Sequence, residues 1–304
     1  MKATVSPSIN SSSPAAVEKS LWAVMADLVK ARLTFLVLLT TAVGFYMGWR
    51  GPMDFWLMAH TLAGTTLLAC GAAALNQLWE REHDARMRRT AERPLPSGRL
   101  QPETVLVFGG ICSAAGLIYL VVAVNLLTSV LGAATLASYL FVYTPLKRVT
   151  WLNTAVGAVP GALPPLMGWT AARGDLTGEG WALFVILFFW QIPHFLAIAW
   201  LYREDYEKAG FVMLPSLDPE GYRTGRQSVS HTLLLVMASL LPFLFHLTGV
   251  VYLCGALLLG AAFLFCAAQF SRQLTRPRAR LLFFISILYL PLLLGLMVLD
   301  KLKY

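Results

Sequence analysis

The feature that most constrains this 304-residue chain is a nearly unbroken succession of long apolar stretches. A helix of roughly 20 apolar residues is long enough to cross the ~30 Å hydrocarbon core of a bilayer. The pattern therefore predicts an all-α integral membrane protein with nine transmembrane helices. The nine stretches run over residues 22–48, 52–78, 104–122, 125–143, 152–172, 180–200, 229–247, 249–269 and 281–300.

Composition supports a membrane protein over a soluble one. Hydrophobic residues make up 57% of the chain and charged residues 13%, whereas a soluble domain carries about 25% charge. Such sparse charge cannot cover the surface of a soluble protein of this length. It argues against a cytosolic enzyme, a disordered chain, a collagen or a nucleic-acid-binding domain. The expected partner is the lipid bilayer, and no nucleic acid is expected despite the net charge of +8.

The basic residues predict the orientation of the spans. With the N-terminus in the cytoplasm, 20 of the 24 lysines and arginines fall on the cytoplasmic side. The other four are Arg50, Arg173, Lys301 and Lys303. This asymmetry predicts a cytoplasmic N-terminus and an external C-terminus. Residues 1–20 are Ser-rich and lack the apolar core of a signal peptide. We expect a disordered cytoplasmic arm there, followed by one membrane domain over residues 21–304.

Oxygen-bearing side chains form a row at the end of the second apolar stretch. Asn76, Glu80 and Asp84 are spaced four residues apart, so on a helix they share one face. Carboxylate and amide oxygens suit Mg²⁺, which also binds waters and substrate phosphates. Arg89 and Arg93 follow closely, and guanidinium groups pair with phosphate oxygens. The row thus predicts a Mg²⁺–diphosphate site, while a solvated mixed-charge loop remains the alternative.

Two further polar segments are candidates for the same site. Lys147 and Arg148 follow the fourth stretch, where they could stabilise a diphosphate leaving group or bind anionic lipid headgroups. Gln191 and His194 lie inside the apolar sixth stretch. An ionisable residue within a span is a functional candidate by default. His194 could be a metal or heme ligand, a proton carrier or a hydrogen-bonded core histidine.

Four segments resemble one known family. The segments are NQLWEREHDARMRRTAERPL (76–95), YTPLKRVTWLNTAVGAVPGALPPLMGW (143–169), WQIPHFLAIAWLYREDYEKAGFVMLP (190–215) and SILYLPLLLGLMVLD (286–300). On these segments the chain resembles the UbiA superfamily of intramembrane prenyltransferases, and most of all its heme-farnesylating branch. The resemblance implies a nine-helix bundle around a central cavity. It also implies Mg²⁺-dependent transfer of a farnesyl group from farnesyl diphosphate to a vinyl group of heme B, with addition of water, to give heme O.

The resemblance also implies roles for individual residues. Catalysis is expected from Asn76, Glu80, Asp84, Lys147 and Asp205, of which all but Lys147 would bind the metal. Diphosphate would be bound by Arg89, Arg93, Lys147, Arg148 and Arg203. The candidate heme contacts are His194, Gln191, Tyr143 and Asn153. The chain departs from the general pattern in two places. Glu80 stands where aspartate is usual, and Tyr202 and Tyr206 have the spacing of the second acidic pair.

Two rival functions stay open at this point. One is a UbiA-type prenyltransferase whose acceptor is an aromatic acid or a quinone precursor, which the segment around His194 disfavours. The other is a membrane transporter, which usually carries its coupling carboxylates near the midplane and not at one interface. The resemblance to the heme-farnesylating branch implies that the protein lies in a bacterial inner membrane. It also makes a heme A synthase, which would consume heme O, a candidate partner.

Overall fold

The structure is a computed structural model that describes residues 20–302. Apart from Ser20, which caps the first helix by accepting a hydrogen bond from the Ala23 amide, the arm predicted at residues 1–20 lies outside the described residues. The long helices are α2 (Ala31–Gly48), α3 (Phe55–Asp84), α4 (Pro102–Ala123), α5 (Leu126–Ala137), α7 (Asn153–Arg173), α8 (Gly178–Leu201), α10 (Tyr222–Ala238), α12 (Val250–Arg272) and α13 (Arg276–Leu299). The short elements are α1 (Leu21–Leu28), the π-helix η1 (Ser138–Tyr143), α6 (Thr144–Leu146), α9 (Arg203–Lys208), the 3₁₀-helix η2 (Leu214–Ser216) and α11 (Leu241–Leu244).

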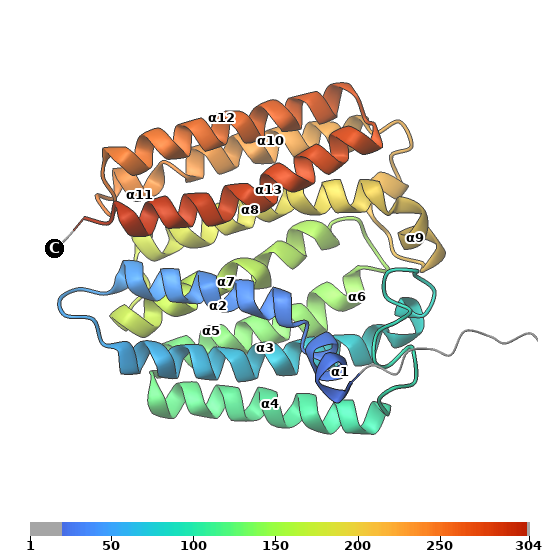
Figure 1. Ribbon diagram of the computed structural model, residues 1–304, viewed down its shortest axis with the longest axis horizontal. Coiled ribbons are helices and arrows are strands. Elements are labelled where there is room, and N and C mark those ends of the chain that lie inside the picture. The colour runs from blue at the N-terminus through green and yellow to red at the C-terminus, as the bar shows by residue number, and fades with distance from the viewer. Residues whose placement is uncertain (1–19, 303–304) are drawn as a thin grey trace, which may run out of the picture.

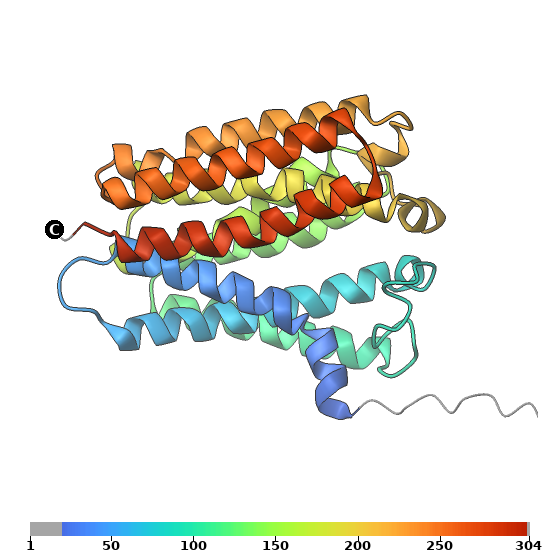
Figure 2. The ribbon, with the colours of Figure 1, turned by 45° about the horizontal axis from the view of Figure 1, so that its top comes forward.

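The helices form one bundle with two halves (Figures 1 and 2). In the first half α3 packs against α4, and α2 packs against α7; in the second, α8, α10, α12 and α13 pack together, with α7 joining α8 to the first half. The end of the last helix returns to the first half, where Lys301 Nζ donates hydrogen bonds to the carbonyls of Tyr46 (2.6 Å) and Trp49 (2.7 Å). These bonds occupy carbonyls at the end of α2 and so fasten α13 to it.

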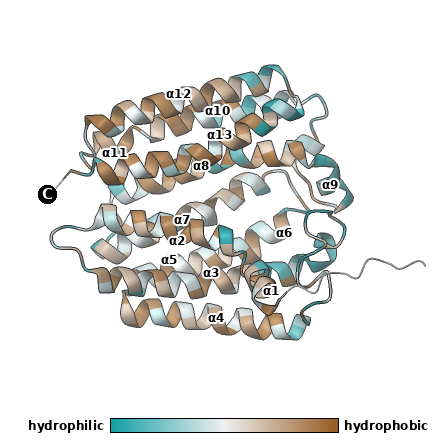
Figure 3. Ribbon diagram, in the orientation of Figure 1, coloured by the Kyte–Doolittle hydropathy of each residue, from teal (hydrophilic) through white to brown (hydrophobic). Residues whose placement is uncertain are grey.

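The surface of the bundle has the polarity of a membrane protein (Figure 3). Apolar residues cover its flanks, as Val122 (81% exposed) and Leu258 (73% exposed) illustrate. Polar residues gather at the end that carries the segments 85–101, 147–152, 202–221 and 273–275, at the right of Figure 3. We call this the basic end. The chain is an integral membrane protein, and the basic end corresponds to the side predicted to face the cytoplasm.

Eight segments of the described chain are long and apolar enough to cross a membrane. The remaining predicted span, over residues 152–172, coincides with α7, which has 21 residues but is interrupted by Pro160, Pro164 and Pro165. Most side chains of α7 are buried among its neighbours α2, α5 and α8. A helix enclosed by protein needs no lipid-facing side chains, which explains its lower apolar content. The all-α membrane fold is confirmed, whereas the count of nine spans is not.

Close approach of α2 and α7 depends on two glycines. A Cβ atom added to Gly44 would overlap the Pro165 carbonyl, and one added to Gly168 would overlap the Thr41 carbonyl. Small residues at such crossings allow two membrane helices to approach backbone to backbone. The two glycines thus set the spacing between the first span and the wall of the bundle interior.

The first predicted span differs from the observed structure. Instead of one helix over 22–48, the chain forms α1 and α2 with a break at Lys30, whose φ of 49° is left-handed. A non-glycine residue in this conformation cannot continue a right-handed helix. Short α1 carries exposed Leu21 and Trp22, the kind of side chains that anchor a helix at a membrane interface. The break turns Lys30 toward the bundle interior.

Candidate active site

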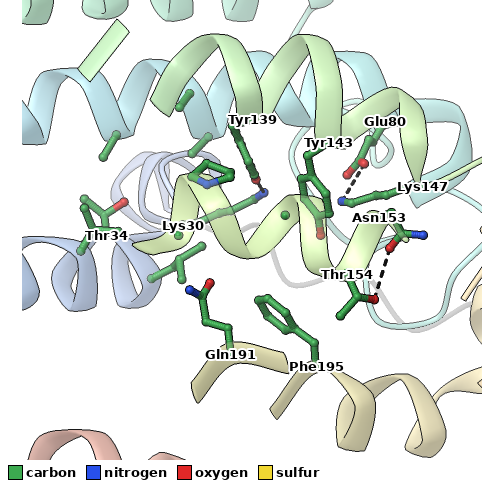
Figure 4. A pocket seen from close by; sticks show the side chains of 18 of the residues that line it. Lys30, Thr34, Glu80, Tyr139, Tyr143, Lys147, Asn153, Thr154, Gln191 and Phe195 are labelled. Atoms are coloured by element: carbon green, nitrogen blue, oxygen red, sulfur yellow. Dashed lines mark hydrogen bonds and ion pairs between the residues drawn. The ribbon is translucent and has the colours of Figure 1, made fainter. Parts of the chain in front are cut away.

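A cavity of about 360 Å³, which we call the central cavity, lies between the two halves of the bundle (Figure 4). Its lining on α3 extends from Thr65 to Asp84, a length of about 28 Å at 1.5 Å per residue. Away from the basic end the walls are apolar, with Leu68, Leu136 and Met167 among them. At the basic end the lining becomes charged. The shape is that of an apolar chamber beneath an ionic mouth.

The three oxygen-bearing residues predicted to share a face of α3 do so. Asn76, Glu80 and Asp84 are all buried on this helix, and Glu80 and Asp84 line the mouth, whereas Asn76 lies behind it. A different segment brings a cation to each of them. Lys30 Nζ donates to Asn76 Oδ1 at 2.6 Å, Lys147 Nζ to Glu80 Oε1 at 2.8 Å, and Arg93 Nη1 to Asp84 Oδ2 at 2.6 Å.

The charges at the mouth perturb one another. Burial, reinforced by the positive charge of Arg93, lowers the pKa of Lys30 to about 7. Burial also acts to lower the pKa of Lys147, but the Glu80 carboxylate together with Tyr143 and Tyr139 outweighs it and holds the pKa of this ammonium above its usual range. Lys30, Arg89, Arg93 and Lys147 line the cavity against only two carboxylates, Glu80 and Asp84. The surplus positive charge suits an anion such as a diphosphate.

A π-helix places two aromatic rings on one wall of the mouth. Tyr139 and Tyr143, at either end of η1, stack with ring centroids 5.7 Å apart. Tyr139 Oη accepts a hydrogen bond from Lys30 Nζ (3.3 Å), and Lys147 Nζ lies 4.5 Å from the centre of the Tyr143 ring. Gly157 on α7 faces that ring, which a Cβ atom would overlap. Short π-helical turns occur frequently at functional sites, and this one positions both tyrosines.

The mouth fits a divalent cation that shares its coordination with a substrate. Among residues 20–302, no three His, Cys, Asp or Glu side chains gather into a closed metal site. Mg²⁺ does not require one, because it is commonly held by one or two carboxylates together with waters and substrate phosphates. Glu80 and Asp84 supply such a pair of carboxylates. The cations now bonded to them are groups that phosphate oxygens also attract.

Five of the residues predicted for the site do not line the central cavity: Asn76, which lies behind the mouth, and Arg148, Arg203, Asp205 and His194. Arg148 is exposed and does not belong to the lining, although the adjacent Lys147 does. Arg203 and Asp205 instead line a neighbouring pocket, described below. His194 packs between Trp190 and Phe283, and its Nδ1 atom hydrogen-bonds Ser286 Oγ at 2.7 Å. These contacts direct its ring toward α13 and away from the chamber.

The other predicted heme contacts lie on the cavity wall. Gln191, Tyr143 and Asn153 all belong to its lining. Gln191 donates hydrogen bonds to the backbone carbonyls of Ala158 and Leu187, so its amide is fixed beside α7. The Asn153 amide donates to carbonyls at Thr150 and Val212 and so joins the start of α7 to the segment that follows α9. Asn153 therefore also has a structural role.

A second pocket of about 670 Å³ opens at the basic end beside the central cavity. Its lining includes Arg88, Arg89, Trp200, Arg203, Asp205 and Arg276. Arg89 lines both spaces, so the two are direct neighbours. We refer to it as the second pocket.

Sequence reasoning missed two residues of the mouth. Neither Lys30 nor Tyr139 is among the site residues that the sequence predicts, and Lys30 is only one of the 20 basic residues on the cytoplasmic side. The left-handed turn that directs Lys30 inward leaves no trace in hydropathy. The π-helix that pairs Tyr139 with Tyr143 has no amino-acid pattern that distinguishes it from an α-helix. The signal that could have identified Lys30 is its position inside the first predicted span, 22–48, since an ionisable residue within a span is a functional candidate.

An apolar chamber within a membrane bundle, with carboxylates, lysines and arginines at its mouth, defines a class: membrane enzymes that act on a lipid with an anionic head. The chain belongs to the UbiA prenyltransferase family, whose model matches residues 37–288. It is 50% identical to a protoheme IX farnesyltransferase of Solibacter usitatus over 284 residues. The aligned region covers 90% of this chain and 97% of that protein. It is 45% identical to the protoheme IX farnesyltransferase of Opitutus terrae, with 91% and 94% of the two chains covered.

Solved structures share the fold. A UbiA homologue from Aeropyrum pernix K1 superposes with a TM-score of 0.71 at 18% identity, over 88% of this chain and 96% of that one. A UbiA homologue from Archaeoglobus fulgidus bound to GPP and Mg²⁺ gives a TM-score of 0.62 at 15% identity, over 90% and 99% of the two chains. At these identities the likeness establishes the UbiA fold.

Proposed function

We propose that this chain transfers the farnesyl group of farnesyl diphosphate to a vinyl group of heme B and adds water, which yields heme O and diphosphate. The observation that carries the proposal is a cavity whose lining on α3 is about 28 Å long and comprises both the ionic mouth and the apolar chamber beneath it. The mouth suits a diphosphate and the chamber suits an isoprenoid chain. The identity of 45–50% to protoheme IX farnesyltransferases supports heme as the acceptor.

In the proposed site, Glu80 and Asp84 hold Mg²⁺, with Asn76 completing the row behind them. When bound, the metal ion supplies positive charge that neutralises the diphosphate. Lys147, Arg93, Lys30 and Arg89 then provide hydrogen bonds to phosphate oxygens. The proposed set leaves out Asp205, Arg203 and Arg148, because these side chains line the second pocket or are exposed.

The bond between C1 of the farnesyl group and oxygen breaks with its electron pair on the diphosphate. Lys147 and Arg93 stabilise the charge that develops on the leaving oxygen. The apolar walls around Leu68 and Met167 exclude water that would capture the allylic cation early. The vinyl carbon of heme then forms the new carbon–carbon bond. Water adds to the resulting cation beside the porphyrin and loses a proton, which leaves the hydroxyl group of heme O.

The heme contacts proposed on the cavity wall are Gln191 and Tyr143, with Asn153 holding the wall in shape. His194 is outside this set, because its ring is engaged by Ser286 and by two aromatic rings. The bacterial relatives support a bacterial inner membrane as the location. The asymmetry of the basic residues supports a basic end and an N-terminus in the cytoplasm and a C-terminus outside. A heme A synthase, which would consume the product, is the proposed partner.

The experiment that tests the function uses the purified chain in lipid nanodiscs with heme B, farnesyl diphosphate and Mg²⁺. We expect a product with the mass of heme O, and no product after chelation of the metal with EDTA. An aromatic acid and a quinone precursor are offered as rival acceptors in parallel reactions. Prenylation of a rival acceptor with none of heme B would refute the proposal.

A further inference from the structure

Apart from Arg89, the second pocket takes no part in the transfer chemistry described above, yet its surplus of positive charge equals that of the central cavity, with four basic groups against two carboxylates in each. We propose that it binds the two propionate carboxylates of the heme acceptor, so that the macrocycle lies across the boundary between the second pocket and the central cavity. This inference rests on the proposed function and adds to it the site that recognises the charged edge of heme.

The arginines of the second pocket come from three distant parts of the chain. Arg88 and Arg89 belong to the segment after α3, Arg203 is the first residue of α9, and Arg276 is the first residue of α13. A tendency to keep basic residues in the cytoplasm accounts for arginines in each of these loops. It does not account for their convergence on one concave site.

Contacts with the protein hold these guanidinium groups in place. Arg203 lies over the Trp200 ring at 5.3 Å, and Arg276 donates a hydrogen bond to the Leu201 carbonyl at 3.1 Å. Arg89 lies 5.6 Å from the Tyr202 ring and donates to Tyr206 Oη at 3.1 Å. Each guanidinium has five N–H donors in a fixed fork. These contacts orient the groups and leave donors for a ligand.

The charge of the pocket fits a dicarboxylate. Four guanidinium groups line it together with two carboxylates, Glu204 and Asp205. The surplus of positive charge remains after these acids are counted. Arginine binds carboxylates through two parallel hydrogen bonds, a geometry that a propionate can satisfy. Two propionates would bring the pocket close to neutrality.

The chemistry of heme B explains why it needs a second anion site. Its vinyl groups and its propionates occupy opposite halves of the macrocycle. When a vinyl group reaches the farnesyl carbon at the mouth, the carboxylates must lie elsewhere, and carboxylates are costly to bury without cationic partners. Lys30, Lys147 and Arg93 are bonded to the row on α3. Further cations line the second pocket, which Arg89 joins to the cavity.

The test measures heme affinity directly, by absorbance titration of ferric heme B into the full chain in nanodiscs of zwitterionic lipid. In the variant Arg203→Gln/Arg276→Gln we expect heme B to bind about tenfold more weakly, because a tenfold change in Kd corresponds to the loss of roughly one charge-assisted hydrogen bond. The dimethyl ester of heme B, which has no carboxylates, should bind the wild-type chain and the variant equally. The KM for farnesyl diphosphate should stay unchanged.

A matched control is Arg280→Gln, which removes an exposed arginine one turn further along α13 that does not line the pocket. It should leave heme affinity unaltered. Equal heme affinity in the double variant and the wild type would overturn the inference, as would an equal loss of affinity for heme B and its ester. A wild-type chain that binds heme B but makes no heme O would refute the proposed function alone. A double variant whose only defect is weaker binding to anionic nanodiscs would identify a lipid-headgroup site and also overturn the inference.

Discussion

At the scale of single residues, the mouth is built from matched pairs. Each member of the row on α3 is bonded to a cation from another segment, and the pair of Lys147 and Glu80 is almost fully buried. Breaking such a pair leaves one charge without a partner, which costs about 3–5 kcal/mol. The same groups are the ones proposed to hold the metal and the diphosphate. The same side chains therefore stabilise the fold through their ion pairs and, in the proposed function, bind the metal and the diphosphate.

Lys147→Met separates these two contributions. We expect kcat to fall roughly 10²–10³-fold, because a donor to the leaving oxygen is lost, and the melting temperature to fall, because Glu80 stays buried and unpaired. The double variant Glu80→Gln/Lys147→Met should recover most of the stability and none of the activity. Steady-state heme O formation and thermal unfolding followed by tryptophan fluorescence measure both. Recovery of activity in the double variant would contradict the proposed roles.

Lys30 permits a second comparison. Both Lys30→Met and Lys30→Gly remove the ammonium, and both should raise the KM for farnesyl diphosphate about tenfold, the value of a charge-assisted hydrogen bond. Only glycine relieves the left-handed backbone at φ 49°, so Lys30→Gly should be about 1–2 kcal/mol more stable than Lys30→Met. Equal KM values in both variants and the wild type would exclude Lys30 from the diphosphate site.

The sequence reveals some of these residues and not others for physical reasons. Four-residue spacing predicts that Asn76, Glu80 and Asp84 share a face, since helix geometry alone decides it. The inward turn of Lys30 depends on one backbone angle that no local pattern encodes. The position of Asp205 depends on how α9 packs after α8, a tertiary feature. Local periodicity therefore finds the row on α3, and only the three-dimensional packing shows which cations meet it.

At the scale of elements, the π-helix η1 sets the register of everything that follows it toward Lys147. Deleting Ala134, an exposed residue of the regular helix α5 one turn before η1, should rotate η1 and the residues after it by about 100°. Tyr143 and Lys147 would then leave the mouth. We expect heme O formation to be lost while the protein still inserts and purifies. Ala134→Ser, which keeps the register, is the control and should retain activity.

The crossing of α2 and α7 can be tested in the same manner. Gly168→Leu should prevent a stable fold, because the added side chain overlaps the Thr41 backbone. Gly295→Leu on α13 introduces the same side chain where a Cβ atom meets nothing within 4 Å, and it should be tolerated. The yield of monodisperse protein in size-exclusion chromatography distinguishes the two. A well-behaved Gly168→Leu variant would disprove the close contact.

Hydropathy predicts elements of this kind well where lipid surrounds them and poorly where protein does. The lipid-facing helices α4, α12 and α13 match the expected stretches closely. The first stretch divides at Lys30, and the seventh begins earlier than expected, at Tyr222, because the polar start of α10 packs against other helices at the basic end. Apolar content therefore identifies the membrane boundary and not the ends of the helices.

At the scale of the whole molecule, the asymmetry of basic residues predicts how the bundle sits in the membrane. The test starts from a chain in which serine replaces the four native cysteines. One variant of it carries Ser97→Cys near the basic end, and the other carries Pro52→Cys at the opposite end; both positions are exposed. A membrane-impermeant maleimide added outside intact spheroplasts should label the Pro52→Cys chain and leave the Ser97→Cys chain unlabelled until the membrane is opened. The reverse labelling would invert the orientation.

The burial of α7 within the bundle has a consequence for biosynthesis. A translocon releases a helix into lipid when its own apolar surface is sufficient, and the interrupted composition of α7 makes it a poor candidate for independent release. Its neighbours α2 and α5 are synthesised before it, and α8 after it. Helix α7 should therefore wait at the translocon until α8 emerges and then enter the membrane against partners that are already in place. The closing of the chamber wall is then a late step in the assembly of the protein.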